Sequence, residues 1–203
     1  MPTMSTLSQL TEVPRPPQSG SSSAPALMAI PYNGDFDAHA ATMLPWLYDR
    51  LKQDGLLDLY FSTRKGASFC AFVRMMSGGS NIILATTQKE GIPDKVIGFM
   101  NWEPMNFGGA HSAKAGFIFL KEFWDGHTST EAGKLLLTEL FANTDIDVVI
   151  GNVAADNRLT SMFLTRLGWN KVGTIPKMQQ YEGVECPANL WCITREEFLH
   201  EQR

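Results

Sequence analysis

Hydrophobic positions in the central part of the chain alternate between short continuous runs and runs with helical spacing. Residues 117–120 form a continuous apolar run of strand length, which is typical of a strand buried on both faces. Residues 130–141 instead place their apolar side chains on one helical face, namely Ala132, Leu135, Leu136, Leu140 and Phe141. The pattern predicts a buried strand that leads through a polar turn into a helix.

The same order follows once more toward the C-terminus. Residues 147–153 are rich in β-branched side chains, which favours a second strand. Asn157 ends a short polar turn and can cap a helix over residues 158–167, and Gly168 is a typical helix stop. Two successive strand-to-helix units predict strands joined by a right-handed crossover.

The flanking segments predict further strands and helices. Residues 26–32 predict a first strand, followed by a helix capped by Asp35, in which Pro45 predicts a kink or a division into two short helices. The remaining predicted elements are a helix over 69–76, an antiparallel meander of strands over 81–87, 96–102 and 115–120, two strands over 171–175 and 189–193, and a helix over 195–202. The predicted fold class is therefore α/β (α+β), with a mixed, mostly antiparallel sheet of about seven strands flanked by helices.

Composition and charge narrow the classes of protein to consider. The chain has 203 residues, a net charge of −4 and 44% hydrophobic residues, which is typical of a globular protein and gives no support for nucleic-acid or anionic-membrane binding. No apolar run is long enough to cross a membrane. The three cysteines leave an odd thiol and have no metal-ligand spacing, which fits a reducing, cytoplasmic compartment and predicts no metal site.

The composition changes near residue 25. Residues 1–24 are rich in Ser and Pro and poor in large apolar side chains, so we expect a flexible leader, with a partner-binding arm as the alternative. Residues 25–203 contain all the predicted strands and helices, so we expect them to form one domain.

The polar turn between the central strand and its helix holds the first candidate chemistry. It consists of Asp125, Gly126, His127, Thr128, Ser129 and Thr130. Thr130 is the expected helix cap, and Glu131 lies in the first turn, where the helix dipole favours negative charge. Because the first N–H groups of a helix have no partner within it, this turn can hold a phosphate-bearing ligand.

Two motifs of the chain resemble a known enzyme family. They are Trp124 followed by Thr130-Glu131-Ala132 and a Leu-Leu-Leu run, and then Asn157-x-x-Thr-Ser-x-x-Leu-x-Arg-Leu-Gly168-Trp169. Both are similar to motifs of the GNAT superfamily of acetyl-CoA-dependent N-acetyltransferases, in the branch that acetylates protein N-termini, ribosomal ones among them. By this resemblance, residues 25–203 form a GNAT-like acyltransferase domain.

The resemblance implies a co-substrate and a place for it. Acetyl-CoA would bind with its phosphates at the turn 125–130, and Asn157 would touch it near the thiol end. Its pantetheine arm would pair, like an extra strand between two diverging strands, with the backbone of Phe117, Ile118, Phe119 and Leu120. The acceptor would be an amine, either a protein N-terminus or a small molecule, and transfer would be direct, without a covalent enzyme intermediate.

Three residues depart from the family pattern. His127 stands where the family has a glycine that lets the backbone approach the pyrophosphate, and Asp125 adds negative charge beside the expected phosphates. Leu164 stands where the family often has a tyrosine that protonates the thiolate. His127 has two interpretations: either it donates a hydrogen bond to a phosphate, or it is tolerated because no pyrophosphate comes close.

Glu103 and Ser161 are the candidate catalytic residues. Glu103, at the end of a predicted strand, can hold a water as general base, and Ser161 is the hydroxyl nearest to the family's serine position. Each also has a simpler interpretation, as a solvated carboxylate and as a helix-surface serine. Two functions follow, an active acetyltransferase or a catalytically inactive GNAT-fold binding or assembly module such as a phage can encode, either one a monomer or a homodimer.

Overall fold

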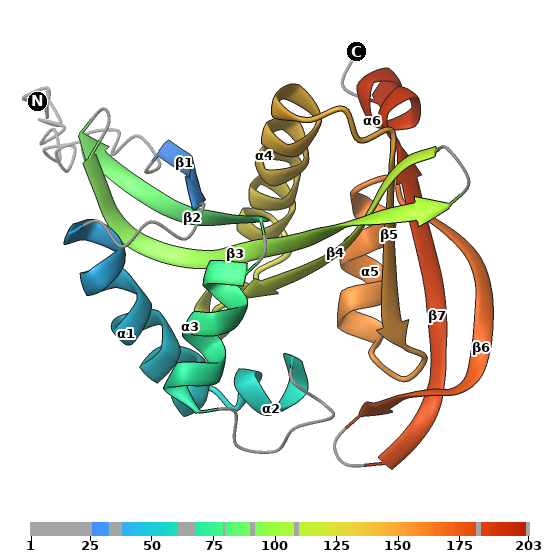
Figure 1. The fold of residues 1–203 in the computed structure, drawn as a ribbon, viewed down its shortest axis with the longest axis horizontal. Helices are drawn as coiled ribbons and strands as arrows, with labels where there is room; N and C mark the ends of the chain where they lie inside the picture. The colour runs from blue at the N-terminus through green and yellow to red at the C-terminus, as the bar shows by residue number, and fades with distance from the viewer. Residues whose placement is uncertain are drawn as a thin grey trace, which may run out of the picture.

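The computed structural model describes residues 26–32, 38–60, 68–78, 80–89, 92–107, 110–181 and 184–201. They form a seven-stranded sheet with helices on both faces (Figure 1). In chain order the elements are β1 (Ala26–Tyr32), α1 (Ala38–Gln53), α2 (Leu56–Tyr60), α3 (Phe69–Gly78), β2 (Ser80–Lys89), β3 (Ile92–Phe107), β4 (Ala110–Phe119), the 3-10 helix η1 (Lys121–Phe123), α4 (Thr128–Asn143), β5 (Val148–Ala154), α5 (Arg158–Arg166), β6 (Asn170–Tyr181), β7 (Val184–Thr194) and α6 (Arg195–Glu201). The predicted leader over residues 1–24 and the predicted cap Asp35 lie outside the described residues.

The strand order in the sheet is β1-β2-β3-β4-β5-β7-β6. Neighbouring strands run antiparallel except β4 and β5, which run parallel and are connected through α4. This arrangement confirms the predicted mixed, mostly antiparallel sheet and the predicted meander of β2, β3 and β4. The parallel pair is the one that the first strand-to-helix unit predicted.

Two hydrophobic cores fill the space on either side of the sheet, and β4 contributes to both. Phe119 belongs to the core beneath α4 and α5, whereas Ile118 and Leu120 belong to the core beneath α1, α2 and α3. We call the two sides of the sheet the α4–α5 face and the α1–α3 face (Figure 1). Burial on both faces explains why residues 117–120 read as one continuous apolar run.

Helix α1 continues through Pro45, so the predicted division into two short helices at that residue is wrong. Proline in a helix interior removes one hydrogen bond and costs about 3 kcal/mol. Leu44, Leu47 and Leu51 lie on one side of the helix and are completely buried. Burying such a side chain stabilises the fold by about 1.5–3 kcal/mol, so the packing of α1 outweighs the loss at Pro45.

Strands β3 and β6 extend beyond the segments that the sequence predicted for them. The prediction for β3 was residues 96–102, and the prediction for β6 was residues 171–175. At its start β3 pairs with β2 and at its end with β4, whereas β6 has an irregularity between Ile175 and Gln179 and then pairs with β7 again up to Tyr181. Main-chain hydrogen bonds to a neighbouring strand need no particular side chain, so the hydrophobic pattern underestimates the length of both strands.

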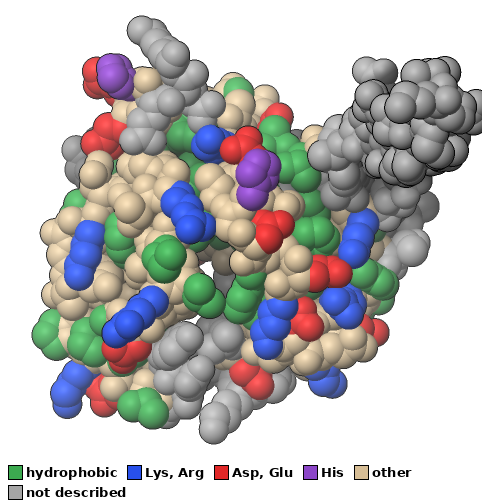
Figure 2. All heavy atoms as spheres, turned by 180° about the vertical axis from the view of Figure 1, so that it is seen from behind, with side chains coloured by type: hydrophobic (Ala, Val, Ile, Leu, Met, Phe, Trp, Pro, Cys, Tyr) green, Lys and Arg blue, Asp and Glu red, His purple; other side chains and the backbone are tan. Residues whose placement is uncertain are grey.

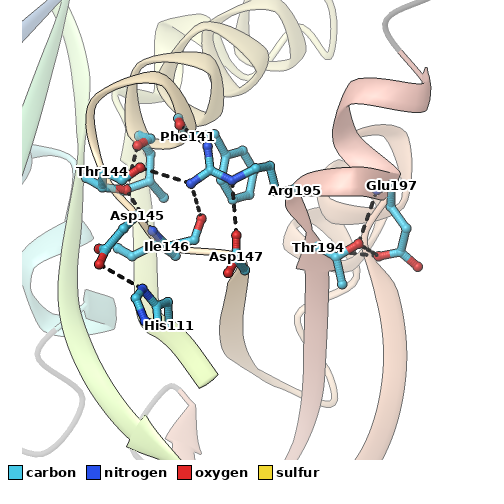
Figure 3. Close-up of polar contacts among 10 residues, drawn as sticks. His111, Phe141, Thr144, Asp145, Ile146, Asp147, Thr194, Arg195 and Glu197 are labelled. Atoms are coloured by element: carbon cyan, nitrogen blue, oxygen red, sulfur yellow. Dashed lines mark hydrogen bonds and ion pairs between the residues drawn. The ribbon is translucent and has the colours of Figure 1, made fainter. Parts of the chain in front are cut away.

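Arg195 fastens the C-terminal end of α4 to the last strand and helix (Figure 3). Its guanidinium donates hydrogen bonds to the carbonyl oxygens of Phe141, of Thr144 at 2.9 Å and of Ile146 at 2.6 Å. Its Nε pairs with Oδ1 of Asp147 at 3.3 Å. A cation here also opposes the partial negative charge at the helix end. These contacts fix α4 at its far end and leave its N-terminal turn at the candidate site.

Candidate functional site

Strands β4 and β5 pair at only three positions and then diverge. The pairs are Ser112 with Val148, Ala113 with Val149 and Lys114 with Ile150. Beyond Lys114, β4 stays paired with β3 and β5 stays paired with β7, so their facing edges separate. We call this space the β4–β5 gap. The backbone of residues 117–119 has no strand partner on its β5 side, as the sequence predicted.

Aromatic side chains line the gap on the α4–α5 face. The ring of Phe163 in α5 lies 5.6 Å from that of Phe117 and 5.4 Å from that of Phe119, measured between centroids. The ring of Trp169 lies 6.0 Å from that of Phe117. Trp169 also approaches β5, since a Cβ added to Gly151 would lie 3.3 Å from Cζ3 of Trp169. Figure 2 shows this face, with a hollow near its centre that has hydrophobic side chains at its rim. These rings belong to the core beneath α4 and α5 or pack against it, and those of Phe119 and Trp169 are buried.

The turn before α4 is capped by the carboxylate of Asp125. Its Oδ1 accepts hydrogen bonds from the backbone N–H of His127 at 2.8 Å and of Thr128 at 2.7 Å, and its Oδ2 accepts one from the Thr128 hydroxyl at 2.6 Å. The Thr128 hydroxyl, together with the two amides, lowers the pKa of Asp125. The hydroxyl of Thr130, the expected cap, instead donates to the carbonyl oxygen of Gly126 at 2.7 Å. The prediction of Thr130 as cap is wrong, because α4 begins two residues earlier.

The hydrogen bonds to Asp125 use some of the backbone N–H groups that were expected to bind a phosphate. The N–H groups of His127 and Thr128 already donate to Asp125. Within the described part of the chain, the N–H groups of Ser129 and Thr130 donate to no residue. The turn therefore keeps two amides for an external anion, and a carboxylate stands beside them.

Arg166 supplies a positive charge to this turn from α5. Its Nη1 lies so close to Gly126 that a Cβ added there would collide with it. Gly126 also has φ +80°, a conformation that disfavours other residues. The guanidinium of Arg166 makes no hydrogen bond or ion pair with any residue that the structure describes. Sequence reasoning missed this residue, because it lies one strand and one helix away from the turn, although it is part of the Arg-Leu-Gly-Trp motif.

Helix α5 places Asn157, Ser161 and Leu164 on the same side of the sheet as the turn. Oδ1 of Asn157 accepts a hydrogen bond from the Thr160 N–H at 3.1 Å, which confirms Asn157 as the predicted cap. The Ser161 hydroxyl donates to the carbonyl oxygen of Asn157 at 3.0 Å. Leu164 is 3% exposed and belongs to the core. Of these three side chains, only Ser161 carries a proton that could be transferred, and that proton is already in a hydrogen bond.

Glu103 lies on the other face of the sheet. On β3, Phe99 belongs to the core beneath α1, α2 and α3, and Glu103 follows it by four residues, so strand alternation places both on the α1–α3 face. Its partner in register on β4 is Lys114, the last residue before the gap. Glu103 is exposed. The structure therefore does not bring Glu103 and Ser161 together but places them on opposite faces at the gap.

Cys192 is the half-buried thiol on β7, opposite Ile150 of β5. Burial, and secondly the carboxylate of Glu197, raise the pKa of Cys192, so the thiol stays protonated. Three or more His, Cys, Asp or Glu side chains arranged to hold a metal ion do not occur among the described residues. None of the described helices combines the length and the apolar character needed to span a membrane.

Solved structures share this fold at low sequence identity. Mycobacterium smegmatis RimJ in complex with CoA-disulfide is 15% identical, with a TM-score of 0.62 over 76% of this chain and 78% of that chain. Vibrio cholerae spermidine N-acetyltransferase in complex with CoA and spermine is 13% identical, with a TM-score of 0.67 over 85% and 98%. Ribosomal-protein-S5-alanine acetyltransferase from Vibrio fischeri is 12% identical, with a TM-score of 0.66 over 85% and 94%.

A family model described as acetyltransferase (GNAT) domain matches residues 23–170. This range contains the strands on both sides of the β4–β5 gap, the turn before α4, and the whole of α5. No curated protein matches the chain. The family match covers most of the chain, and the seven-stranded sheet with its single parallel pair agrees with it. The chain belongs to the GNAT family of acetyltransferases, enzymes whose acetyl donor is acetyl-CoA.

Proposed function

We propose that this protein is an N-acetyltransferase that moves an acetyl group from acetyl-CoA directly to a primary amine. The observation that carries the proposal is the β4–β5 gap, because the unpaired edge of β4 runs from the turn before α4 to Lys114, the partner in register of the exposed Glu103. Such an edge can pair with an extended ligand as a further strand would. The amine acceptor is a protein N-terminus or a small molecule; the similar structures include a spermidine N-acetyltransferase and a ribosomal-protein-S5-alanine acetyltransferase.

The residues at the turn fit the phosphates of acetyl-CoA. Two free amides, of Ser129 and Thr130, and the guanidinium of Arg166 are donors for an anion. The pantetheine arm would then follow the free backbone edge of residues 117–120. The carboxylate of Asp125 opposes this binding by its charge, which limits the affinity without blocking the free amides.

Transfer requires one bond to form, one to break and two proton movements. The amine nitrogen attacks the thioester carbonyl carbon, the C–S bond breaks, the amine loses a proton and the departing thiolate gains one. Glu103, on the α1–α3 face, takes the amine proton through a water. The departing thiolate takes its proton from a water, while Ser161, on the α4–α5 face, donates a hydrogen bond to the sulfur in place of its bond to Asn157. The placement of Glu103 and Ser161 on opposite faces suits one residue that acts on the attacking amine and another that acts on the departing sulfur.

Arg166→Gln should weaken acetyl-CoA binding about tenfold, because it removes one charge-assisted hydrogen bond to a phosphate. Isothermal titration calorimetry with acetyl-CoA measures the dissociation constant. Arg74→Gln is the matched control, since Arg74 is exposed on α3 at the other face of the sheet. An equal affinity of wild type and Arg166→Gln would contradict phosphate binding at this turn.

Cys192→Ser should keep kcat/KM within about twofold of the wild type, because a protonated, half-buried thiol is a poor nucleophile. Mass spectrometry of the wild-type protein after mixing with acetyl-CoA alone should show no covalently acetylated form. A stable acetyl adduct that disappears in Cys192→Ser would replace direct transfer by a two-step mechanism.

A second candidate function is that of a binding or assembly module without catalysis. The observation that favours it is the cap at Asp125, which already occupies two of the amides at the turn. Titration of the wild-type protein distinguishes the two functions. A ligand that binds only the folded state raises the melting temperature, so an enzyme should melt at a higher temperature with millimolar acetyl-CoA, whereas a module should not change.

A further inference from the structure

A pair of hydrogen-bonded asparagines lies on the α1–α3 face. Asn81 of β2 is 2% exposed. Its Nδ2 donates to the carbonyl oxygen of Met76 in α3 at 2.7 Å, and its Oδ1 accepts from Nδ2 of Asn101 in β3 at 3.0 Å. Burying a polar side chain costs free energy unless it forms hydrogen bonds, and hydrogen bonds hold the side chain in one orientation.

The direction of this chain of hydrogen bonds is fixed from its inner end. A backbone carbonyl oxygen can only accept, so Met76 requires the Nδ2 of Asn81. The Oδ1 of Asn81 must then face Asn101, and Asn101 must present its own Nδ2. The other polar atom of the Asn101 side chain is therefore Oδ1, an acceptor. This Oδ1 receives no hydrogen bond from any residue that the structure describes.

Asn101 is placed at the mouth of the β4–β5 gap. Its partner in register on β4 is Gly116, two residues beyond Lys114, where the pairing of β4 with β5 ends. Gly116 has no side chain, so at this position in register no side chain of β4 stands between Asn101 and the gap. The face opposite to the proposed acetyl-CoA path thus carries a free acceptor at the point where the two strands separate.

Glu103 provides a second acceptor on the same face of β3. It follows Asn101 by two residues, so both side chains leave the strand on the α1–α3 face. Its carboxylate has no hydrogen-bond or ion-pair partner within the described ranges. Two neighbouring acceptors, one of them anionic, favour a ligand that brings several N–H donors and a positive charge, as a primary ammonium group does.

We infer that Oδ1 of Asn101 and the carboxylate of Glu103 bind the acceptor amine at the mouth of the gap, and that Asn81 is a positioning residue that fixes the Asn101 amide. This inference rests on the proposed function. The ammonium group first loses one proton to solvent; the neutral amine then donates one N–H to Asn101 and, as it attacks, gives a proton to Glu103 through a water. Its lone pair then points into the gap, toward a thioester held on the other face.

The test compares two probe amines, spermine and a short peptide that begins with alanine, in steady-state assays with acetyl-CoA. Asn101→Leu should raise KM for the accepted amine at least about tenfold with a smaller change in kcat, because it removes a binding contact of the amine. Its dissociation constant for acetyl-CoA, measured by calorimetry, should stay within about twofold. Met105→Leu, the next residue but one after Glu103 on this face, is the matched control and should leave both constants unchanged.

Three further variants keep the test decisive if Asn101→Leu does not fold. Glu103→Gln changes an exposed side chain, so it should fold normally and still raise KM for the amine severalfold. Asn81→Ala should raise KM for the amine less than Asn101→Leu does. Without Asn81 the side-chain amide of Asn101 can rotate, but it is still present. Rescue supports the positioning role: Asn81→Gln should come closer to the wild-type KM than Asn81→Ala does.

The outcomes separate this inference from the proposed function. If the wild-type protein does not bind acetyl-CoA, the proposed function fails first. If it binds acetyl-CoA but Asn101→Leu and Glu103→Gln keep the wild-type KM, the amine site lies elsewhere and the inference is wrong. Binding of acetyl-CoA without acetylation of either probe would also overturn it, since two free acceptors at the gap should accept a simple primary amine.

Discussion

Asp125→Ala should bind acetyl-CoA about ten to thirty times more tightly than the wild-type protein at neutral pH. The substitution removes a negative charge beside the proposed phosphate site and releases the N–H groups of His127 and Thr128. Both changes favour an anionic ligand at the start of α4. Calorimetric titration measures the gain directly.

Two controls separate the charge of Asp125 from its hydrogen bonds. Asp125→Asn removes the charge but keeps an acceptor for the two amides, so its affinity should fall between those of the wild type and Asp125→Ala. Asp49→Ala removes an exposed carboxylate from α1, on the other face, and should leave the affinity unchanged. If Asp125→Ala binds no better than the wild type, the amides at this turn do not contact the cofactor.

The same substitution should lower the stability of the free protein, because a helix cap is worth about 1 kcal/mol. The pKa of Asp125 is lowered in the folded state, first by the hydrogen bond from the Thr128 hydroxyl. Its contribution is therefore fully present above the pKa of the unfolded chain, about 3.9, and is lost as the pH falls through the lower folded value. Melting temperatures of wild type and Asp125→Ala should differ at neutral pH and converge in acid.

Arg195→Ala should be the most destabilising of these substitutions, at about 2–4 kcal/mol of unfolding free energy. It leaves the carbonyl oxygens of Phe141, Thr144 and Ile146 without their charged donor and Asp147 without its ion-pair partner (Figure 3). The melting temperature should fall by roughly 5–12 °C. Urea unfolding followed by circular dichroism measures the free energy.

The planar guanidinium of Arg195 reaches three carbonyl oxygens at once, and Arg195→Lys tests whether this geometry matters. A lysine keeps the charge near the end of α4 but can meet only part of the three carbonyl oxygens, so it should recover less than half of the loss. Glu196→Ala, at the exposed next position, should change stability by no more than about 0.5 kcal/mol. A loss below about 1 kcal/mol for Arg195→Ala would mean that these carbonyls are well hydrated without it.

The sequence predicted the order of strands and helices and the family with few errors. The apolar run at residues 117–120 predicted the central strand, and the helical spacing after it predicted the helix. A strand buried on both faces has a continuous apolar run, whereas a helix buried on one face has apolar residues at helical spacing. Asn157 was identified as a helix cap from its type and place alone, and the structure confirms it. The errors fall where backbone pairing or packing outweighs local preference, as at Pro45 and in the long strands β3 and β6.

The candidate site was predicted only in part. Its location at the turn before α4 and along one edge of β4 followed from the motifs. The sequence also offered Thr130 as the cap, whereas in the structure His127 holds the N-cap position and the carboxylate of Asp125 accepts the hydrogen bonds from the first N–H groups. Hydroxyl and carboxylate side chains within one short turn compete for the same N–H groups, and residue type alone does not decide which one satisfies them.

By itself, the sequence determined the local elements, the two motifs and the family, because these depend on residues close together along the chain. Only the tertiary structure decided that Arg166 meets Gly126, that Asn101 bonds Asn81, and that Glu103 and Ser161 lie on opposite faces. Each of these relations joins residues from different strands or helices. They depend on the order and register of the strands in the sheet, and a shift of register by a single residue would turn every side chain of a strand to the other face.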